Sequence, residues 1–135
     1  MSEKIQYINP EGLSKNPAFS QVVVTQGNGK TIYIGGQNSI NEKSEIVGKG
    51  DLAVQTQQTL QNIQTALMAC DATFDNIVKL TIYVVQGQNI YEGFQTSQKF
   101  MHNMVNPPAI SVVMVAGLAN PDFLIEVEAI AFIPE

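Results

Sequence analysis

The sequence predicts a single α+β domain in which a mixed β-sheet carries two helices on one of its faces. Runs of β-branched residues alternate along the chain with two segments of helical periodicity, in the order ββαβαββ. The 135 residues are enough for one hydrophobic core, and 44% of them are hydrophobic while only 14% are charged. We therefore expect one folded domain over residues 1–135.

Two β-branched runs open the predicted sheet. They are SQVVVTQ, residues 20–26, and TIYIGGQ, residues 31–37, and the segment GNGK lies between them. Its Asn-Gly pair suits the positive φ values of a tight hairpin turn. We expect these two strands to pair with each other in antiparallel orientation.

The first helix is predicted from Asp51, as N-cap, to about residue 72. Its apolar side recurs at steps of three and four residues, and its other side carries amides that should give it solubility without ion pairs. The apolar side comprises Leu52, Thr56, Leu60, Ile63, Leu67 and Cys70, and the amide side includes Gln55, Gln58 and Asn62.

A central strand and a second helix follow. NIVKLTIYVV, residues 76–85, alternates in the manner of a strand covered on both faces. Residues 89–104 form a helix, which Asn106, Pro107 and Pro108 should stop. The shared face of this helix carries Ile90, Phe94, Ser97, Met101 and either Met104 or Val105.

The last stretch, residues 106–132, is extended and β-branched with a single turn, and it predicts two further strands. Two helices cover only one face of a sheet, whereas these strands carry apolar residues on both faces. The sequence therefore predicts an oligomer that covers the other face.

Charge and composition exclude several classes of function. The formal net charge is −5, the seven basic residues are all scattered lysines, and there is no arginine. A nucleic-acid binder needs clustered cations, so we expect no nucleic-acid partner. The single cysteine, Cys70, and the single histidine, His102, have no metal-ligand spacing, and we expect neither a metal nor another cofactor.

The sequence also bears on location. Its longest apolar run is too short to span a membrane, and the N-terminal MSEKIQYINPEG lacks the apolar core of a secretory signal. A single cysteine is compatible with a reducing compartment. We expect a cytoplasmic protein without a membrane partner.

The segments IYIGGQ, NIVKLTIYV and NPPAISVVMVAGLANPDFLIEVEAIAF resemble the RidA/YjgF family, also known as L-PSP ribonucleases, from about Ser20 to Phe132. The resemblance implies a chorismate-mutase-like fold and a homotrimer whose sheets close into a barrel. It also implies three small-molecule clefts between subunits and the hydrolytic release of ammonia from enamines and imines such as 2-aminoacrylate.

The resemblance places the family's site on residues that are mostly altered. The arginine that binds the substrate carboxylate falls on Ile110, an aromatic hydroxyl falls on Phe19, and the catalytic glutamate is retained as Glu126. The other ligand-binding positions fall on Gly35 in place of a serine, Gly93 in place of an asparagine and Val112 in place of a cysteine. Their motif neighbours are Gly36, Gln37 and Ser111.

These residues also have plain structural interpretations. Gly35 and Gly36 fit a β-bulge or a close backbone approach as well as a ligand-facing loop. Glu126 and Glu128 fit surface carboxylates on an edge, but they share one strand face with Leu124 and Ile130, and these apolar neighbours favour partial burial. A partly buried Glu126 would have a raised pKa and could protonate an enamine carbon or hold a water.

We favour a small-metabolite-binding homotrimer in which deaminase chemistry is weak, altered or lost because Ile110 replaces the arginine. The alternative is an active hydrolytic enamine or imine deaminase that takes a neutral or differently anchored substrate. Ribonuclease activity is the weakest hypothesis, because the chain is acidic and has one histidine and no arginine.

Overall fold

The computed structural model describes residues 4–135, so the first three residues of the predicted domain and of the N-terminal stretch lie outside it. The elements follow the order βββαβαββ, with one strand more than predicted at the start. They are β1 (Ile5–Ile8), β2 (Val22–Thr25), β3 (Gly29–Gln37), α1 (Leu52–Ala69), a 3-10 turn η1 (Phe74–Asn76), β4 (Ile77–Val85), α2 (Ile90–Met101), β5 (Ala109–Val115) and β6 (Ile125–Pro134).

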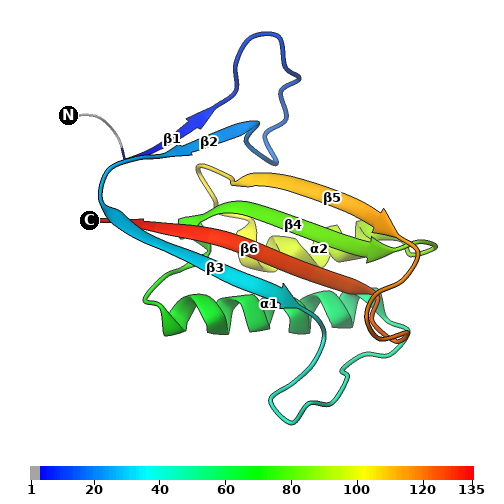
Figure 1. Ribbon diagram of the computed structural model, residues 1–135. Coiled ribbons are helices and arrows are strands. Elements are labelled where there is room, and N and C mark those ends of the chain that lie inside the picture. The colour runs from blue at the N-terminus through cyan, green and yellow to red at the C-terminus, as the bar shows by residue number, and fades with distance from the viewer. Residues whose placement is uncertain (1–3) are drawn as a thin grey trace.

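The main sheet has four strands in the order β3-β6-β4-β5. The β4–β5 pair is parallel, and β6 is antiparallel to both β3 and β4, so the sheet is mixed. Figure 1 shows α1 and α2 lying together behind one face of this sheet. We call this the helix face and the opposite one the open face. The α+β prediction is confirmed. Strand β4 lies inside the sheet as predicted, but within this chain the helices cover only one of its two faces.

Helix α1 begins and packs as its sequence predicts. The side chain of Asp51 accepts a hydrogen bond from the backbone N–H of Val54 at 3.1 Å, which satisfies one of the free donors of the first turn. Leu60, Ile63 and Leu67 are buried in the core against β6 and β3. The regular spacing of these apolar residues thus places α1 on the sheet.

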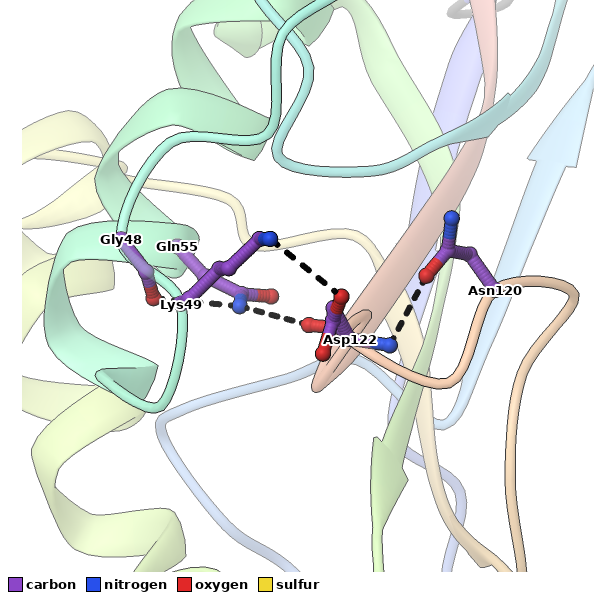
Figure 2. A network of polar contacts seen from close by, with 5 residues as sticks. All are labelled: Gly48, Lys49, Gln55, Asn120 and Asp122. Atoms are coloured by element: carbon purple, nitrogen blue, oxygen red, sulfur yellow. Dashed lines mark hydrogen bonds and ion pairs between the residues drawn. The ribbon is translucent and has the colours of Figure 1, made fainter.

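The amide side of α1 differs from the prediction, because Gln55 is completely buried. Its Nε2 donates to the carbonyl oxygens of Gly48 and Asp122 at 3.1 and 2.9 Å, and its Oε1 accepts from the N–H of Leu124 at 2.9 Å. Figure 2 shows this amide joining the loop before α1 to the turn before β6. Gln55 therefore fixes the start of β6 to the helix.

The predicted hairpin between residues 20–26 and 31–37 is wrong. Strand β2 pairs with β1, and β3 pairs with β6 in the main sheet. The chain turns between the two sheets at Gly27, with φ +77°, while Gly29 already pairs with Pro134. A Cβ atom at Gly29 would clash with the ring of Phe132, so this glycine allows the strands to pack closely and does not form a hairpin turn.

Helix α2 ends three residues earlier than predicted, so the two prolines do not stop it. Its last residue is Met101 and His102 is the C-cap. The backbone N–H of His102 lies 3.0 Å from the carbonyl oxygen of Gln98, and the ring Nδ1 lies 2.8 Å from the same atom. A carbonyl oxygen only accepts, so Nδ1 is the donor and the ring helps to end the helix.

Candidate functional site

A cavity of about 540 Å³ lies between α2 and the helix face of the sheet. Its walls come from both helices, from three strands, and from the loops before β2 and before β5. Leu60 contributes from α1, and Ile82, Val84 and Val127 contribute from β4 and β6. The volume is within the range of about 300 to 1,000 Å³ that is usual for small-molecule pockets.

Four of the predicted ligand-binding residues line this cavity, namely Phe19, Gly93, Ile110 and Val112. Ile110 and Val112 pair with Leu80 and Ile82 of β4, so the two-residue period of the strands directs both towards the helices.

Gly93 has a packing role in addition to its place in the cavity wall. A Cβ atom there would lie 3.3 Å from Oγ1 of Thr56 and 3.5 Å from Cδ2 of Leu52, both on α1. The glycine thus allows the two helices to approach closely. The family's asparagine at this position would have to displace α1 or its side chains.

The cavity wall, as far as residues 4–135 form it, contains no Asp, Glu, Lys or Arg. The hydroxyl groups of Thr56 and Ser97 bond within their own helices, whereas the wall residues Tyr91 and Gln98 are exposed. Oγ1 of Thr56 donates to the carbonyl oxygen of Leu52 at 2.8 Å, and Oγ of Ser97 donates to that of Phe94 at 2.6 Å. The interior therefore offers apolar contact, and His102 lies in its wall as an exposed residue at the rim.

Glu126 lies on the open face of the sheet, away from this cavity. Its neighbours Ile125 and Val127 are buried towards the helices, and the alternation of the strand turns Glu126 the other way. A Cβ atom at Gly36 would lie 2.6 Å from its Oε2, and Nδ2 of Asn38 donates to its Oε1 at 3.3 Å. The structure thus brings together two of the predicted site residues, Gly36 and Glu126.

An amide chain that sequence reasoning missed supports Glu126 from α1. Gln58 donates to Oδ1 of Asn62 at 2.9 Å, and Asn62 donates to the carbonyl oxygens of Asn38 and Ile40 at 3.0 and 2.8 Å. Asn38 in turn bonds to Glu126 and to the carbonyl oxygen of Ile125. The sequence signal for this support is the uncharged amide face of α1, which by itself predicts only solubility.

The two glycines on β3 lie in an irregular stretch of strand. The register between β3 and β6 shifts between Ile34 and Gln37. This irregularity agrees with the interpretation of Gly35 and Gly36 as a β-bulge. Nε2 of Gln37 donates to the carbonyl oxygen of Gly35 at 3.2 Å, and a Cβ atom at Gly35 would meet nothing within 4 Å. Of the two glycines, only Gly36 lies against another side chain, that of Glu126.

Charged and polar side chains gather on the open face near Glu126. The hydroxyl of Tyr83 donates to Oε1 of Glu128 at 2.9 Å. This hydrogen bond, followed by burial and by the charges of Glu128 and Glu126, raises the pKa of Tyr83 above its ordinary value of 10.0. These carboxylates thus favour the neutral, hydrogen-bond-donating form of the phenol.

Lys79 and Ser111 also belong to this open face. Nζ of Lys79 donates to Oγ of Ser111 at 2.8 Å. Ser111 precedes Val112 and follows Ile110 on β5, so its side chain points to the opposite face from theirs. Within one chain, Lys79 is therefore on the wrong side of the sheet to replace an arginine at position 110.

The sequence matches the Endoribonuclease L-PSP family over residues 12–133. The chain belongs to this family. A RutC family protein of Pyrococcus horikoshii is 32% identical over 104 residues, which cover 77% of this chain and 80% of that protein. A protein of Rattus norvegicus named 2-iminobutanoate/2-iminopropanoate deaminase is 30% identical over 114 residues, covering 84% of this chain and 79% of its own length.

Solved structures agree with this membership of the L-PSP family. A Rid family protein of unknown function from Yersinia pestis superposes with a TM-score of 0.83 at 34% identity, covering 96% of this chain and 98% of that one. A Thermotoga maritima structure described as a putative endoribonuclease has a TM-score of 0.69 at 27% identity, covering 100% of this chain and 99% of its own. The fold is that of the family.

In this L-PSP family chain, the sheet separates the residues on which the resemblance places the family's site. Phe19, Gly93, Ile110 and Val112 line the cavity on the helix face, whereas Glu126 and Ser111 lie on the open face. Among residues 4–135 no three His, Cys, Asp or Glu side chains form a metal-binding group. The same residues include no helix that is both long and apolar enough to cross a membrane.

Proposed function

We propose that this L-PSP family protein is a homotrimer that binds a small metabolite in clefts between subunits, and that 2-imino acid deaminase chemistry is weak, altered or lost. The observation that carries the proposal is Ile110. It lines a cavity without a charged side chain, at the position where the resemblance places the arginine that binds the substrate carboxylate. Without a cation there, a carboxylate would be desolvated and unpaired.

Two features of the open face support an assembly. Tyr33 and Val113 expose 77% and 40% of their surface on this face, which the helices do not cover. Glu126 and the cavity are separated by the sheet of their own chain, so a shared site requires Glu126 of one copy beside the cavity of another. A closed trimer of the family type satisfies both requirements.

The alternative is an active hydrolytic deaminase with a neutral or differently anchored substrate. The observation in its favour is the support of Glu126 by Asn38 and the amides of α1, since a carboxylate held in one orientation suits proton transfer. Relatives from Rattus norvegicus and Homo sapiens carry the name 2-iminobutanoate/2-iminopropanoate deaminase. An enzyme needs Glu126 for turnover, whereas a binder does not.

The experiment compares ammonia release from enzymatically generated 2-aminoacrylate by the wild type, Glu126→Gln, Ile110→Arg, and Ile110→Arg with Glu126→Gln. A charge-assisted hydrogen bond contributes about 1.5 to 3 kcal/mol, so the arginine should raise activity by about ten- to a hundredfold. Recovery should be partial, because Phe19 and Gly35 still differ from the family pattern. Met68→Arg is the matched control, since Met68 is an exposed residue of α1 outside the cavity wall.

The outcomes separate the two functions. Wild-type activity that equals that of an unaltered family member and is lost in Glu126→Gln would replace the binding proposal by the deaminase. A gain in Ile110→Arg that the second substitution abolishes supports both the cleft and the role of Glu126. Light scattering should give a trimer at micromolar concentration, and a monomer would remove the cleft between subunits.

A further inference from the structure

We propose that the cavity between α2 and the sheet takes an uncharged, mainly apolar ligand with one hydrogen-bond donor, which His102 binds through Nε2. The inference rests on the proposed function for the existence of a ligand and adds its chemical class and a binding residue. Nothing in the resemblance assigns a role to position 102.

The first step concerns charge. In the described chain the cavity wall has no Asp, Glu, Lys or Arg side chain, and its wall residues Leu60, Val84 and Val127 are buried. Moving a carboxylate or ammonium group into such a place strips its water and returns no partner. The part of a ligand that is buried against the wall of this chain must therefore be neutral.

The second step concerns the polar atoms around the interior. The hydroxyls of Thr56 and Ser97 donate within their helices. At the other wall, the carbonyl oxygens of Pro107 and Pro108 accept from Oγ and N–H of Ser20 at 2.6 and 3.0 Å. These four groups have partners without a ligand, and the polar side chains of the wall that remain besides His102, those of Tyr91 and Gln98, belong to exposed residues. The buried interior therefore favours apolar ligand surface.

The third step concerns His102 at the rim. Its Nδ1 carries a proton, because that nitrogen lies 2.8 Å from the carbonyl oxygen of Gln98, which only accepts. In the neutral ring Nε2 then has the free lone pair, and it accepts a hydrogen bond from an N–H or O–H group. The contact to Gln98 holds the ring orientation, so the acceptor is positioned before a ligand arrives.

These three steps define the class of ligand. It has an apolar body, aliphatic or aromatic, that fits a cavity of about 540 Å³, and an alcohol, phenol, amide or neutral imine N–H that reaches the rim. A carboxylate is disfavoured twice, because the wall has no Lys or Arg and, in the neutral ring, the lone pair of Nε2 repels it. Methionine and aromatic residues in the wall, Met101, Met104 and Phe94, adapt to such a body.

The test uses three probes with the same ring system, which are naphthalene, 2-naphthol and 2-naphthoate, titrated into the full-length protein by calorimetry. Naphthalene measures the apolar cavity alone, 2-naphthol adds a donor, and 2-naphthoate adds a charge. We expect 2-naphthol to bind about two- to tenfold more tightly than naphthalene, as one neutral hydrogen bond allows. We expect 2-naphthol to bind at least about tenfold more tightly than 2-naphthoate.

Variants assign the effects to residues. His102→Phe keeps an aromatic ring and removes the acceptor, so 2-naphthol should fall to the affinity of naphthalene, whose own binding should not change. Lys99→Ala, an exposed residue of α2 outside the cavity wall, is the control and should change neither. Val112→Trp fills the cavity from an exposed strand position and should weaken all three probes.

Each outcome has a distinct meaning. Equal binding of 2-naphthoate and 2-naphthol, or an unchanged preference in His102→Phe, would overturn the ligand class or the role of His102 while leaving a binding cavity in place. Binding that survives Val112→Trp would place the probes elsewhere and overturn the inference. If no probe binds, the cavity is not a ligand site, and the proposed function then depends on Ile110→Arg and the light-scattering result alone.

Discussion

The carboxylate of Glu126 lies directly against the backbone of Gly36. A Cβ atom at position 36 would lie 2.6 Å from Oε2 and 2.9 Å from Cδ of Glu126. Gly36 therefore leaves room for this side chain on the open face, in the stretch where the register between β3 and β6 shifts. The contact joins two residues that are 90 positions apart in the sequence.

The first prediction concerns this contact. Gly36→Ala should destabilise the protein by about 0.5 to 1.5 kcal/mol, because the flexible end of the Glu126 side chain must move and lose its hydrogen bond from Asn38. Gly35→Ala is the matched control, and with nothing within 4 Å it should leave stability unchanged or raise it by up to about 1 kcal/mol. Urea unfolding measures both.

A double-mutant cycle identifies the cause of that loss. In a Glu126→Ala background, Gly36→Ala should cost much less, with a coupling of about 0.5 to 3 kcal/mol. An undiminished cost would mean that the backbone at position 36 matters and the carboxylate does not.

The second prediction is a pH dependence. Since the pKa of Tyr83 is raised, the folded state holds this proton more tightly than the unfolded state does. The stability this adds is present below the unfolded value of 10.0 and is lost as the pH rises through the folded pKa. Tyr83→Phe should therefore lose less stability above pH 10.0 than the wild type, in unfolding experiments across that range.

Tyrosinate absorbance provides an independent measurement. Glu128→Gln should move one late-titrating tyrosine back towards 10.0, because the hydrogen bond to Glu128 is the largest cause of the shift. Glu92→Gln, on the exposed side of α2, is the control and should leave the titration curve as it is. If both substitutions gave the same curve, the pair would not be coupled.

The third prediction compares the two side chains that join the loop before α1 to the turn before β6 (Figure 2). Gln55→Leu should cost about 1 to 3 kcal/mol, because the partners at Gly48, Asp122 and Leu124 lose their hydrogen bonds in a buried place. Lys49→Ala removes only a salt bridge of 3.7 Å between exposed side chains, which should cost less than about 1 kcal/mol. A larger effect at Lys49 in thermal unfolding would reverse this order.

The fourth prediction concerns nucleic acid. A chain with a net charge of −5 and seven scattered lysines cannot release the counterions that support non-specific binding. We expect no measurable RNA binding at physiological salt, whether by filter binding or by fluorescence anisotropy. RNA cleavage by a nuclease-free preparation, lost on substitution of this chain, would contradict it.

Local sequence determined the helices and the identity of most strands. The N-cap at Asp51 and the spacing of Leu60, Ile63 and Leu67 act within a few turns, so they specify α1 without knowledge of the rest of the fold. The alternation on β6 similarly indicates that Glu126 and Glu128 share one face. The absence of arginine, which makes Ile110 the central question, is a property of the sequence alone.

Only the tertiary structure decided how these pieces meet. The turn at Gly27 is compatible with a hairpin, but β3 pairs with β6, about 100 residues away, because Gly29 packs against Phe132 and β2 takes β1 as its partner. No local pattern encodes such pairings, since they depend on which distant strand completes the sheet. The same holds for the division of the site, in which the sheet separates Ile110 from Glu126, and for Gln55, whose partners come from two loops.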